Sequence, residues 1–298
     1  MLRVTFNTLF RNTLRDVQRT GAEFARAQQQ VSSGKRLQQA SDDPTSAATG
    51  LQERSELRAI DRYRGANDSV DSRLRVVDTV LSDLISGLTV AQTRGAAGRT
   101  TVLTPEQREA VALEIEGVRE SSLTAVNTSY RGMYLFAGSR STTAPYSRTG
   151  NTVSGYQGDT TVVSIDIART SSTAVSVDGG AMLQGGAAQD VFNTLAALAA
   201  AVRSGNMTAI DTGLTEIDAA FERVTQVQSR VGAALSALPG ERARLDELRR
   251  ASDTRRSQAE EISLSAAITE MTRAQQAQQA AIAAAGTNQQ VTLLDYLR

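Results

Sequence analysis

Residue types that carry out most enzyme chemistry are scarce in this chain. It contains no cysteine and no histidine, which excludes thiol nucleophiles and most soft metal sites and removes the imidazole that usually acts as a general base near neutral pH. Carboxylates, lysine and tyrosine remain, and we single out no catalytic, metal-binding or cofactor-binding set among them. We therefore expect a protein that is not an enzyme and that needs neither a metal nor a cofactor.

Three short motifs could bind a phosphate or a cation, and each has a simpler interpretation. "VSSGKRL" contains Gly34 followed by lysine but lacks the upstream glycine of a phosphate-binding loop, so Gly34 is predicted to end a helix. "GAAGRT" at 95–100 predicts a turn. Asp42 and Asp43 could hold a cation, but Asp43 directly precedes Pro44, an order that favours a helix cap with proline at the first helical position.

The charge balance and the apolar pattern exclude two classes of partner. Lysine and arginine together number 32, as do aspartate and glutamate, so the basic excess that binds nucleic acid or an anionic membrane is missing. The apolar stretch at 194–202 is far too short to cross a bilayer. Arg3, Arg11 and Arg15 interrupt the first residues, which do not resemble a secretory signal peptide. We expect no nucleic-acid partner, no membrane insertion and, for any export, a route without a cleaved signal.

The apolar content favours long helices that pack on one another. Hydrophobic residues make up 40% of the chain but aromatic residues only 4%, so small aliphatic side chains must fill the core. Apolar residues recur at alternating steps of four and three, the seam of a coiled coil, on both sides of the centre. Pro239 lies in the returning run and predicts a kink or a break there. The predicted rod core consists of Val70, Leu74, Val77, Leu81, Leu84 and Leu88, together with Ile210, Leu214, Ile217, Phe221 and Val224.

The centre of the chain predicts a small β insert. Gly, Ser and Thr dominate from 138 to 188, and "TTVVSIDIA" at 160–168 alternates with a period of two. We expect three or four strands that lean on their helical neighbours. The stretch "YRGMYLFAGSRSTTAPY" at 130–146 concentrates aromatic rings at the boundary, where they are expected to fill the joint between helices and strands. The predicted joint residues are Tyr130, Tyr134, Leu135, Phe136, Gly138 and Tyr146.

The order helices, strands, helices predicts a mainly α fold. The two arms are expected to form a long antiparallel helical bundle, a coiled-coil rod, with the small central β insert closing its far tip. The expected divisions are an N-terminal helix at 1–40, outgoing rod helices at 41–137, the β insert at 138–188, returning rod helices at 189–262, and a C-terminal helix with its tail at 263–298.

The two outermost helices carry the weakest seams. Gly21, Gln28, Gln275 and Gln278 occupy seam positions, so burial of the other positions offsets little of the backbone entropy that ordering costs. We expect both ends to be disordered in the isolated chain and to become helical when several copies pack together. The predicted assembly interface consists of Phe10, Leu14, Val17, Phe24, Val31, Leu264, Ile268, Met271, Ile282, Leu293, Leu294, Tyr296 and Leu297.

Both arms resemble a known family. "QQVSSGKRLQQASDDPTSAATG" resembles the N-terminal flagellin motif, in which Ser-Ser-Gly-x-Arg/Lys-Leu is followed by Asp-Asp-x-x-x-Ala. "AEEISLSAAITEMTRAQQ" and the residues after it are similar to the C-terminal helix of the same family. "GMYLFAGSRSTTAPY" and the ending "TLLDYL" resemble the hook-associated branch, whereas filament flagellins usually end in a Ser-Leu-Leu type of tail. The N-terminal match falls on Ser32, Ser33, Gly34, Arg36, Leu37, Asp42, Asp43, Ala47 and Ala48.

The resemblance implies structural work in the bacterial flagellum. Members of this branch are exported unfolded through the flagellar type III export apparatus and assemble outside the cell as a ring of identical copies that joins the hook to the filament. Their terminal helices form the inner tube, and the β insert faces outward. The implied partners are further copies, the preceding hook-associated protein, flagellin, whose assembly the ring templates, and a cytoplasmic export chaperone on the C-terminal helix.

Two other functions remain as alternatives. A filament flagellin would polymerise alone into long filaments, whereas a junction protein would need a hook tip. A cytoplasmic coiled-coil adaptor would be a compact, stably helical dimer with protected ends.

Overall fold

The computed structural model describes residues 6–150, 152–185 and 190–296, with side chains for residue 8 and for residues 11–150, 152–185 and 190–287. The fold is mainly α with small antiparallel β pairs, which confirms the predicted fold class. The chain divides into two compact units, residues 1–59 with 248–298, and residues 60–247. The helices are α1 (Phe6–Ser33), α2 (Pro44–Ala97), α3 (Pro105–Val126), α4 (Gly179–Leu183), α5 (Val191–Ser204), α6 (Met207–Glu260) and α7 (Leu264–Tyr296).

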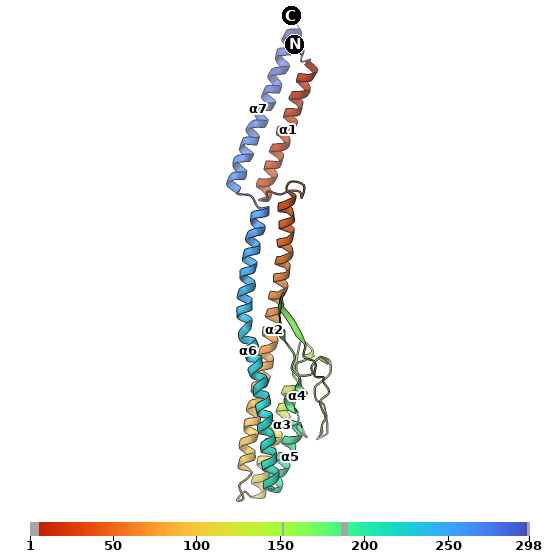
Figure 1. Cartoon of the computed structure of the whole chain (residues 1–298), viewed down its shortest axis with the longest axis vertical. Helices are drawn as coiled ribbons and strands as arrows, with labels where there is room; N and C mark the ends of the chain where they lie inside the picture. Colours follow the sequence, from red (N-terminus) through yellow and green to blue (C-terminus); the bar gives the residue numbers. More distant parts are fainter. Residues whose placement is uncertain (1–5, 151, 186–189, 297–298) are drawn as a thin grey trace. The chain divides into compact units, whose positions relative to one another are not determined.

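The first unit is built from the two arms of the chain. Helices α1 and α7 lie side by side and antiparallel, so that the start of α1 and the end of α7 are neighbours (Figure 1). The first turns of α2 and the last turns of α6 complete this unit. Ion pairs join them, with Arg255 Nε 2.7 Å from a Glu53 carboxylate oxygen and an Arg54 guanidinium nitrogen 2.6 Å from Glu260.

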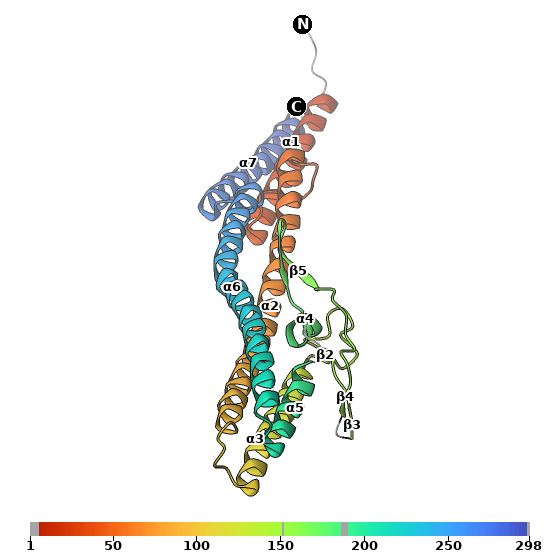
Figure 2. The same ribbon diagram turned by 60° about the horizontal axis from the view of Figure 1, so that its bottom comes forward.

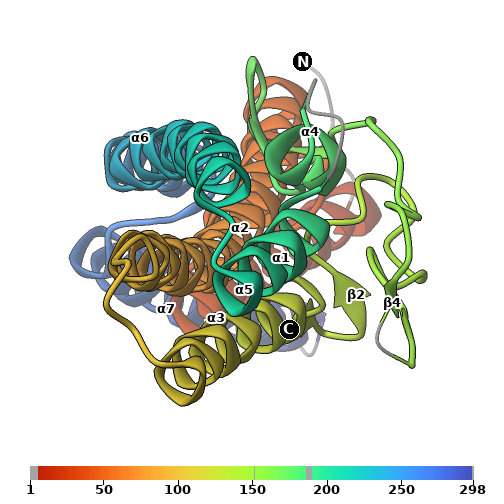
Figure 3. The same ribbon diagram turned by 90° about the horizontal axis from the view of Figure 1, so that it is seen from below.

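The second unit is a bundle of four helices. Figure 3 shows α5, α3 and the adjoining parts of α2 and α6 close together, and their buried side chains form one hydrophobic cluster. Most predicted rod-core residues are buried there, while Leu214 and Phe221 are half-buried and pack against the core. Helices α3 and α5 supply further core residues that are not in the predicted rod core, among them Ile115, Leu195 and Leu198. Gly95 brings α2 close to this layer, because a Cβ there would meet Leu214 at 2.8 Å and Leu198 at 3.0 Å.

The far end of this bundle is closed by helix turns and not by the β insert, so that prediction was wrong. Residues 98–104 turn the chain from α2 into α3, which begins at a capping box between Thr104 and Gln107. At the same end, Gly205 adopts a left-handed conformation and ends α5. Helix α3 therefore runs back along α2 before any strand forms, and the strands lie beside the helices (Figure 2).

Pro239 neither breaks α6 nor ends it. The helix continues from Met207 to Glu260 with Pro239 inside it, so of the two predicted alternatives, a kink or a break, the break does not occur. Proline has no N–H to donate to the carbonyl of Leu235 one turn earlier. Leu238 beside it is buried and belongs to the hydrophobic core, and this burial offsets part of the cost of the missing hydrogen bond.

Within 138–188 the described residues form four strands in two hairpins, in line with the predicted three or four strands, and a further hairpin lies just before them in the range assigned to the outgoing helices. The pairs are β1 (Ser129–Tyr130) with β2 (Met133–Tyr134), β3 (Arg148–Thr149) with β4 (Thr152–Val153), and β5 (Ser164–Ala168) with β6 (Ser171–Ala174). The period of two at 160–168 becomes a strand only from Ser164 onward. Single hydrogen bonds tie the neighbouring extended segments, such as Val175 N to Val163 O at 2.8 Å and Val177 N to Leu135 O at 3.1 Å.

Candidate functional site

The joint between the helices and the hairpins is centred on Tyr146. Its ring is buried and meets Phe192 of α5 edge-on, with 4.8 Å between centroids, and Tyr156 at 5.7 Å. Asn127, the residue that follows α3, donates its side-chain amide to Tyr146 O at 2.9 Å and accepts from Tyr146 N at 3.3 Å. The end of α3 is thereby fixed to the aromatic cluster.

The predicted joint residues separate into two groups. Leu135, Phe136, Gly138 and Tyr146 are buried. Tyr130 and Tyr134 belong to the first hairpin and are only half-buried. Tyr156, Phe192 and Asn127 also belong to the joint but were not predicted. Glycines at 155 and 158 flank Tyr156, as glycines at 132 and 138 flank the predicted residues Tyr134 to Phe136, and this similarity could have pointed to Tyr156.

Tyr156 and the glycines around it allow the backbone segments to approach closely. The Tyr156 hydroxyl donates to Phe136 O at 3.0 Å or to Asp159 O at 3.1 Å. A Cβ on Gly180 would come within 2.7 Å of the Tyr156 ring, and one on Gly138 would collide with the Asp159 carbonyl. Burial raises the pKa of Tyr156 to about 12 and raises that of Tyr146 still further.

A second cluster lies in the first unit, where the chain crosses between its helices. Residues 34–43 connect α1 to α2 and residues 261–263 connect α6 to α7. Two backbone hydrogen bonds join these crossovers, Arg36 N to Glu260 O at 2.8 Å and Ile262 N to Gly34 O at 3.1 Å. Gly34 supports this geometry with a φ of 67°, as expected for a residue that ends a helix.

The Arg36 guanidinium connects the first crossover to the start of α2 and to the last turn of α6. It donates to Asp43 Oδ2 at 3.2 Å, to Ser46 Oγ at 2.9 Å and to the Ala259 carbonyl at 3.0 Å. Asp43 caps α2 by accepting from Ser46 N at 3.1 Å. Hydrogen bonds from Ser46, with a smaller contribution from Arg36, lower the pKa of Asp43 to about 2.

Asp42 serves the same crossover and shows no sign of a cation site. Its carboxylate accepts from the backbone N–H groups of Gln38 and Gln39 at 3.1 and 3.0 Å. Within the part of the chain that the structure describes, no group of carboxylates is arranged to hold a metal ion. Over the same residues, no helix is long and apolar enough to span a membrane.

The terminal helices pack through small residues and leave larger ones outside. Among the side chains that the structure describes, the buried ones are Ala267 and Ala274 on α7 and Ala27 on α1. Leu264, Ile268 and Ile282 are 56%, 45% and 53% exposed. Steps of four and fourteen residues put these three on one side of α7, because the helix repeats every 3.6 residues. We call Leu264, Ile268 and Ile282 the exposed row.

The other predicted interface residues are placed as follows. Leu14 is 48% exposed on α1, while Val17, Phe24, Val31 and Met271 are half-buried. The half-buried and buried side of α1 includes Thr13, Thr20 and Ala27, one position before the predicted Leu14, Gly21 and Gln28. The side chains of Phe10, Leu293, Leu294 and Tyr296, and the whole of Leu297, lie outside the described residues.

Comparison with known proteins identifies the family. Residues 4–141 match the N-terminal helical region of bacterial flagellin, and residues 214–297 match its C-terminal helical region. The chain belongs to the flagellin family. The two matches include α1, α2, α3 and α7 whole and most of α6, so both crossovers and the exposed row of this flagellin-family chain lie in the matched regions.

Within the flagellin family, the chain is similar to hook-associated proteins. It is 26% identical over 147 residues to flagellar hook-associated protein 3 of Escherichia coli, a match that covers 49% of this chain and 46% of the relative. It is 24% identical over 172 residues to the protein of the same name from Salmonella typhimurium, covering 57% and 53%. The chain therefore matches about half the length of each of these relatives.

Solved structures share the fold of this flagellin-family chain. The crystal structure of the flagellar junction protein FlgL from Legionella pneumophila superposes with a TM-score of 0.60 at 15% identity. The superposition covers 72% of this chain and 100% of that one. At this identity the likeness concerns the fold.

Proposed function

We propose that this chain is a structural protein of the bacterial flagellum that joins the hook to the filament and provides the template on which flagellin assembles. The similarity to two flagellar hook-associated proteins 3 carries this proposal. The mainly α fold, with two terminal helices that pack on each other, suits a protein whose work is assembly.

The exposed row gives this proposal a physical basis. Leu264, Ile268 and Ile282 are about half exposed in the isolated chain. Burying the remainder of each side chain against a neighbouring copy would contribute roughly half of the ~1.5–3 kcal/mol that full burial is worth. Leu14 of α1 offers a further exposed side chain on the same helix pair. A ring of identical copies would bury such residues, with the terminal helices as its inner layer.

The terminal helices are also proposed to depend on assembly for their order. Their contact in one chain relies on alanine and half-buried residues, which stabilise it weakly. In a dilute monomer, we expect amide hydrogens of residues 1–40 and 263–298 to exchange with little protection. Strong protection there would contradict this proposal and would favour a cytoplasmic coiled-coil adaptor.

The proposed partners follow from the junction role. Further copies would bury the exposed row, the preceding hook-associated protein would contact one side of the ring, and flagellin the other. A cytoplasmic chaperone would hold the C-terminal helix before the flagellar type III apparatus exports the chain without a cleaved signal.

A polymerisation assay separates the junction role from that of a filament flagellin. Purified protein should stay unpolymerised alone and should bind to isolated hook tips that carry the preceding hook-associated protein. Flagellin added afterwards should then grow into filaments. Long filaments formed by the purified protein alone would contradict the junction role and support the flagellin alternative.

Variants of the exposed row test the interface in the same assay. The double variant Ile268→Ser with Ile282→Ser should keep the helix content of the monomer, because both side chains are about half exposed. It should bind hook tips at least tenfold more weakly. Val102→Ser is the matched control, since Val102 is 83% exposed in the turn between α2 and α3, far along the chain from the row. Equal binding by both variants would remove the row from the interface.

A further inference from the structure

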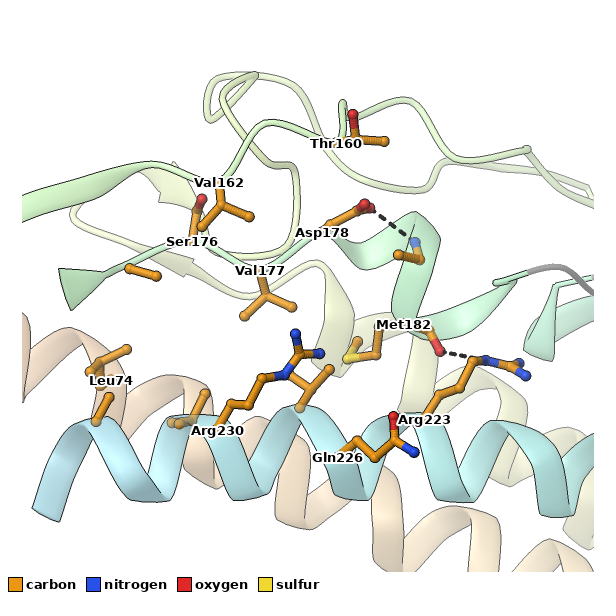
Figure 4. Close-up of a pocket in the computed structure, with 15 residues that line it drawn as sticks. Leu74, Thr160, Val162, Ser176, Val177, Asp178, Met182, Arg223, Gln226 and Arg230 are labelled. Atoms are coloured by element: carbon orange, nitrogen blue, oxygen red, sulfur yellow. Dashed lines mark hydrogen bonds between the residues drawn. The ribbon is translucent and has the colours of Figure 1, made fainter.

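A cleft in the second unit lies between α6 and the segment that carries β6 and α4. It has a volume of about 450 Å³, which is within the range of ligand-binding clefts. Figure 4 shows Val177, Asp178 and Met182 on one wall and Arg223, Gln226 and Arg230 of α6 on the other. This cleft is separate from the aromatic joint and from the exposed row, because no residue of either lines it.

The floor of the cleft is apolar. Val227 and Val231 of α6, Leu74 of α2 and Met182 of α4 are buried side chains that line it. Val162 stands at the mouth and is 47% exposed. An apolar side chain that entered the cleft would therefore be surrounded by aliphatic carbon and by the Met182 thioether.

The rim on α6 carries two arginines without a carboxylate partner. Arg223 donates to the backbone carbonyls of Met182 at 3.1 Å and Leu183 at 3.4 Å, which satisfy hydrogen bonds but do not neutralise its charge. Arg230 is exposed and, among the described residues, has no hydrogen bond or ion pair. The opposite wall holds one carboxylate, Asp178, whose Oδ1 accepts from Ala181 N at 3.0 Å.

This rim differs from the rest of α6. The arginines of the helix that form ion pairs are Arg242, Arg244, Arg249, Arg255 and Arg256. At the cleft, by contrast, Arg223 and Arg230 form no ion pair among the described residues, and the lining contains one carboxylate, that of Asp178. The cleft thus combines an apolar floor with an excess of positive charge, and its best ligand is apolar in the middle and acidic on both sides.

We propose that this cleft binds an extended acidic peptide segment of another protein, with an apolar residue between two acidic ones. Arg223 and Arg230 are seven residues apart, or about 10 Å along the helix. In an extended peptide, residues i, i+2 and i+4 face the same side, and i and i+4 are about 13 Å apart. The arginine side chains are long and flexible enough to span the difference of about 3 Å between these two separations. The fitting pattern is therefore acidic-x-apolar-x-acidic, with the apolar residue on the valine floor.

A fluorescence anisotropy titration tests the proposal with full-length protein. The probe is a fluorescein-labelled peptide of sequence Gly-Ser-Glu-Ser-Val-Ser-Glu-Ser-Gly, and the matched peptide has lysine in place of both glutamates. We expect saturable binding of the first peptide only. Arg230→Gln should raise its Kd about tenfold, because a charge-assisted hydrogen bond is lost. Arg244→Gln on the same helix, outside the cleft, should leave the Kd unchanged.

Arg230→Gln is the decisive variant because Arg230 stabilises nothing in the described fold, so the protein should keep its helix content. Failure of the glutamate peptide to bind would overturn the proposal, as would equal binding by wild type and Arg230→Gln or by both peptides. Sedimentation velocity provides the last comparison. Self-association that Arg230→Gln abolishes, without peptide binding, would assign the cleft to a second copy and overturn the peptide.

Discussion

Replacement of Gly138 by alanine tests how tightly the helix–hairpin joint is built. Gly138 and Gly150 both have a φ of 63°, a region in which an L-residue is strained by roughly 1–2 kcal/mol. They differ in their surroundings, since a Cβ on Gly150 meets nothing within 4 Å whereas one on Gly138 collides with the Asp159 carbonyl. Gly150→Ala is therefore a matched control that isolates the backbone strain.

The additional cost at Gly138 depends on how well the Asp159 segment can move. Asp159 N donates to Ala137 O at 3.2 Å, Ser139 N donates to Asp159 Oδ1 at 2.6 Å, and the Tyr156 hydroxyl lies 3.1 Å from Asp159 O. Relief of the collision must stretch these bonds, and such overpacking costs about 1–3 kcal/mol. We expect Gly150→Ala to lower the free energy of unfolding by about 1 kcal/mol and Gly138→Ala by about 2–4 kcal/mol.

Urea unfolding followed by near-UV circular dichroism in the tyrosine bands measures this difference, because Tyr146 and Tyr156 lie in the cluster that the substitution disturbs. The free energy of unfolding of both variants should depend on urea concentration with the same slope as wild type, and the two variants should differ in the urea concentration at the midpoint of unfolding. Equal midpoints for Gly138→Ala and Gly150→Ala would show that the Asp159 segment yields freely, and would refute the account of the joint.

Two further predictions concern the crossover and the tyrosine hydroxyl. Arg36→Ala removes hydrogen bonds to Ser46 and the Ala259 carbonyl worth about 1–2 kcal/mol. Amide exchange at residue 262, measured by mass spectrometry, should therefore accelerate roughly tenfold. Unchanged exchange, as expected for the exposed control Arg15→Ala, would count against the crossover cluster. Tyr156→Phe should destabilise the fold by about 1–2 kcal/mol at neutral pH, because the acceptors at Phe136 and Asp159 lose their donor. Since the folded pKa of Tyr156 is raised from 10.0 to about 12, its contribution is complete below pH 10 and is lost as the pH rises to 12. The wild-type urea midpoint should fall over that window more steeply than that of the variant, and parallel pH profiles would refute this origin of the loss.

The helices were predictable because their signals are local and periodic. The seam from Val70 to Leu88 repeats at steps of four and three, and all of its predicted members are buried. The caps at Gly34, Asp43 and Thr104 each act within one turn of their own helix. Chemistry of this kind can be read from neighbouring residues alone.

The hairpins were less predictable because their stability comes from distant residues. Alternation at 160–168 predicted one strand, but Val163 N is bonded to the Ser176 hydroxyl and Val177 N to the Leu135 carbonyl. The position of the insert depends on α3 running back along α2, which is decided by the turn at 98–104. Pro239 is a similar case, since tertiary packing outweighs its local cost.

For the terminal helices, one feature was predictable from the sequence and another was not. The helical period of their apolar residues was predictable. The face on which α1 and α7 pack was not, because alanine residues are buried between these helices while several leucine and isoleucine side chains are exposed. The outcome for the predicted seam is therefore mixed. Leu14, Leu264, Ile268 and Ile282 are exposed in the single chain, whereas Val17, Phe24, Val31 and Met271 are half-buried. The exposed apolar residues are the ones that we expect further copies of the chain to cover.

Electron microscopy of cells from which the gene has been deleted tests the junction role most directly. The account predicts intact hooks without attached filaments and flagellin shed into the medium, with filaments restored when the intact gene is returned. Normal filaments on the deletion cells would contradict it.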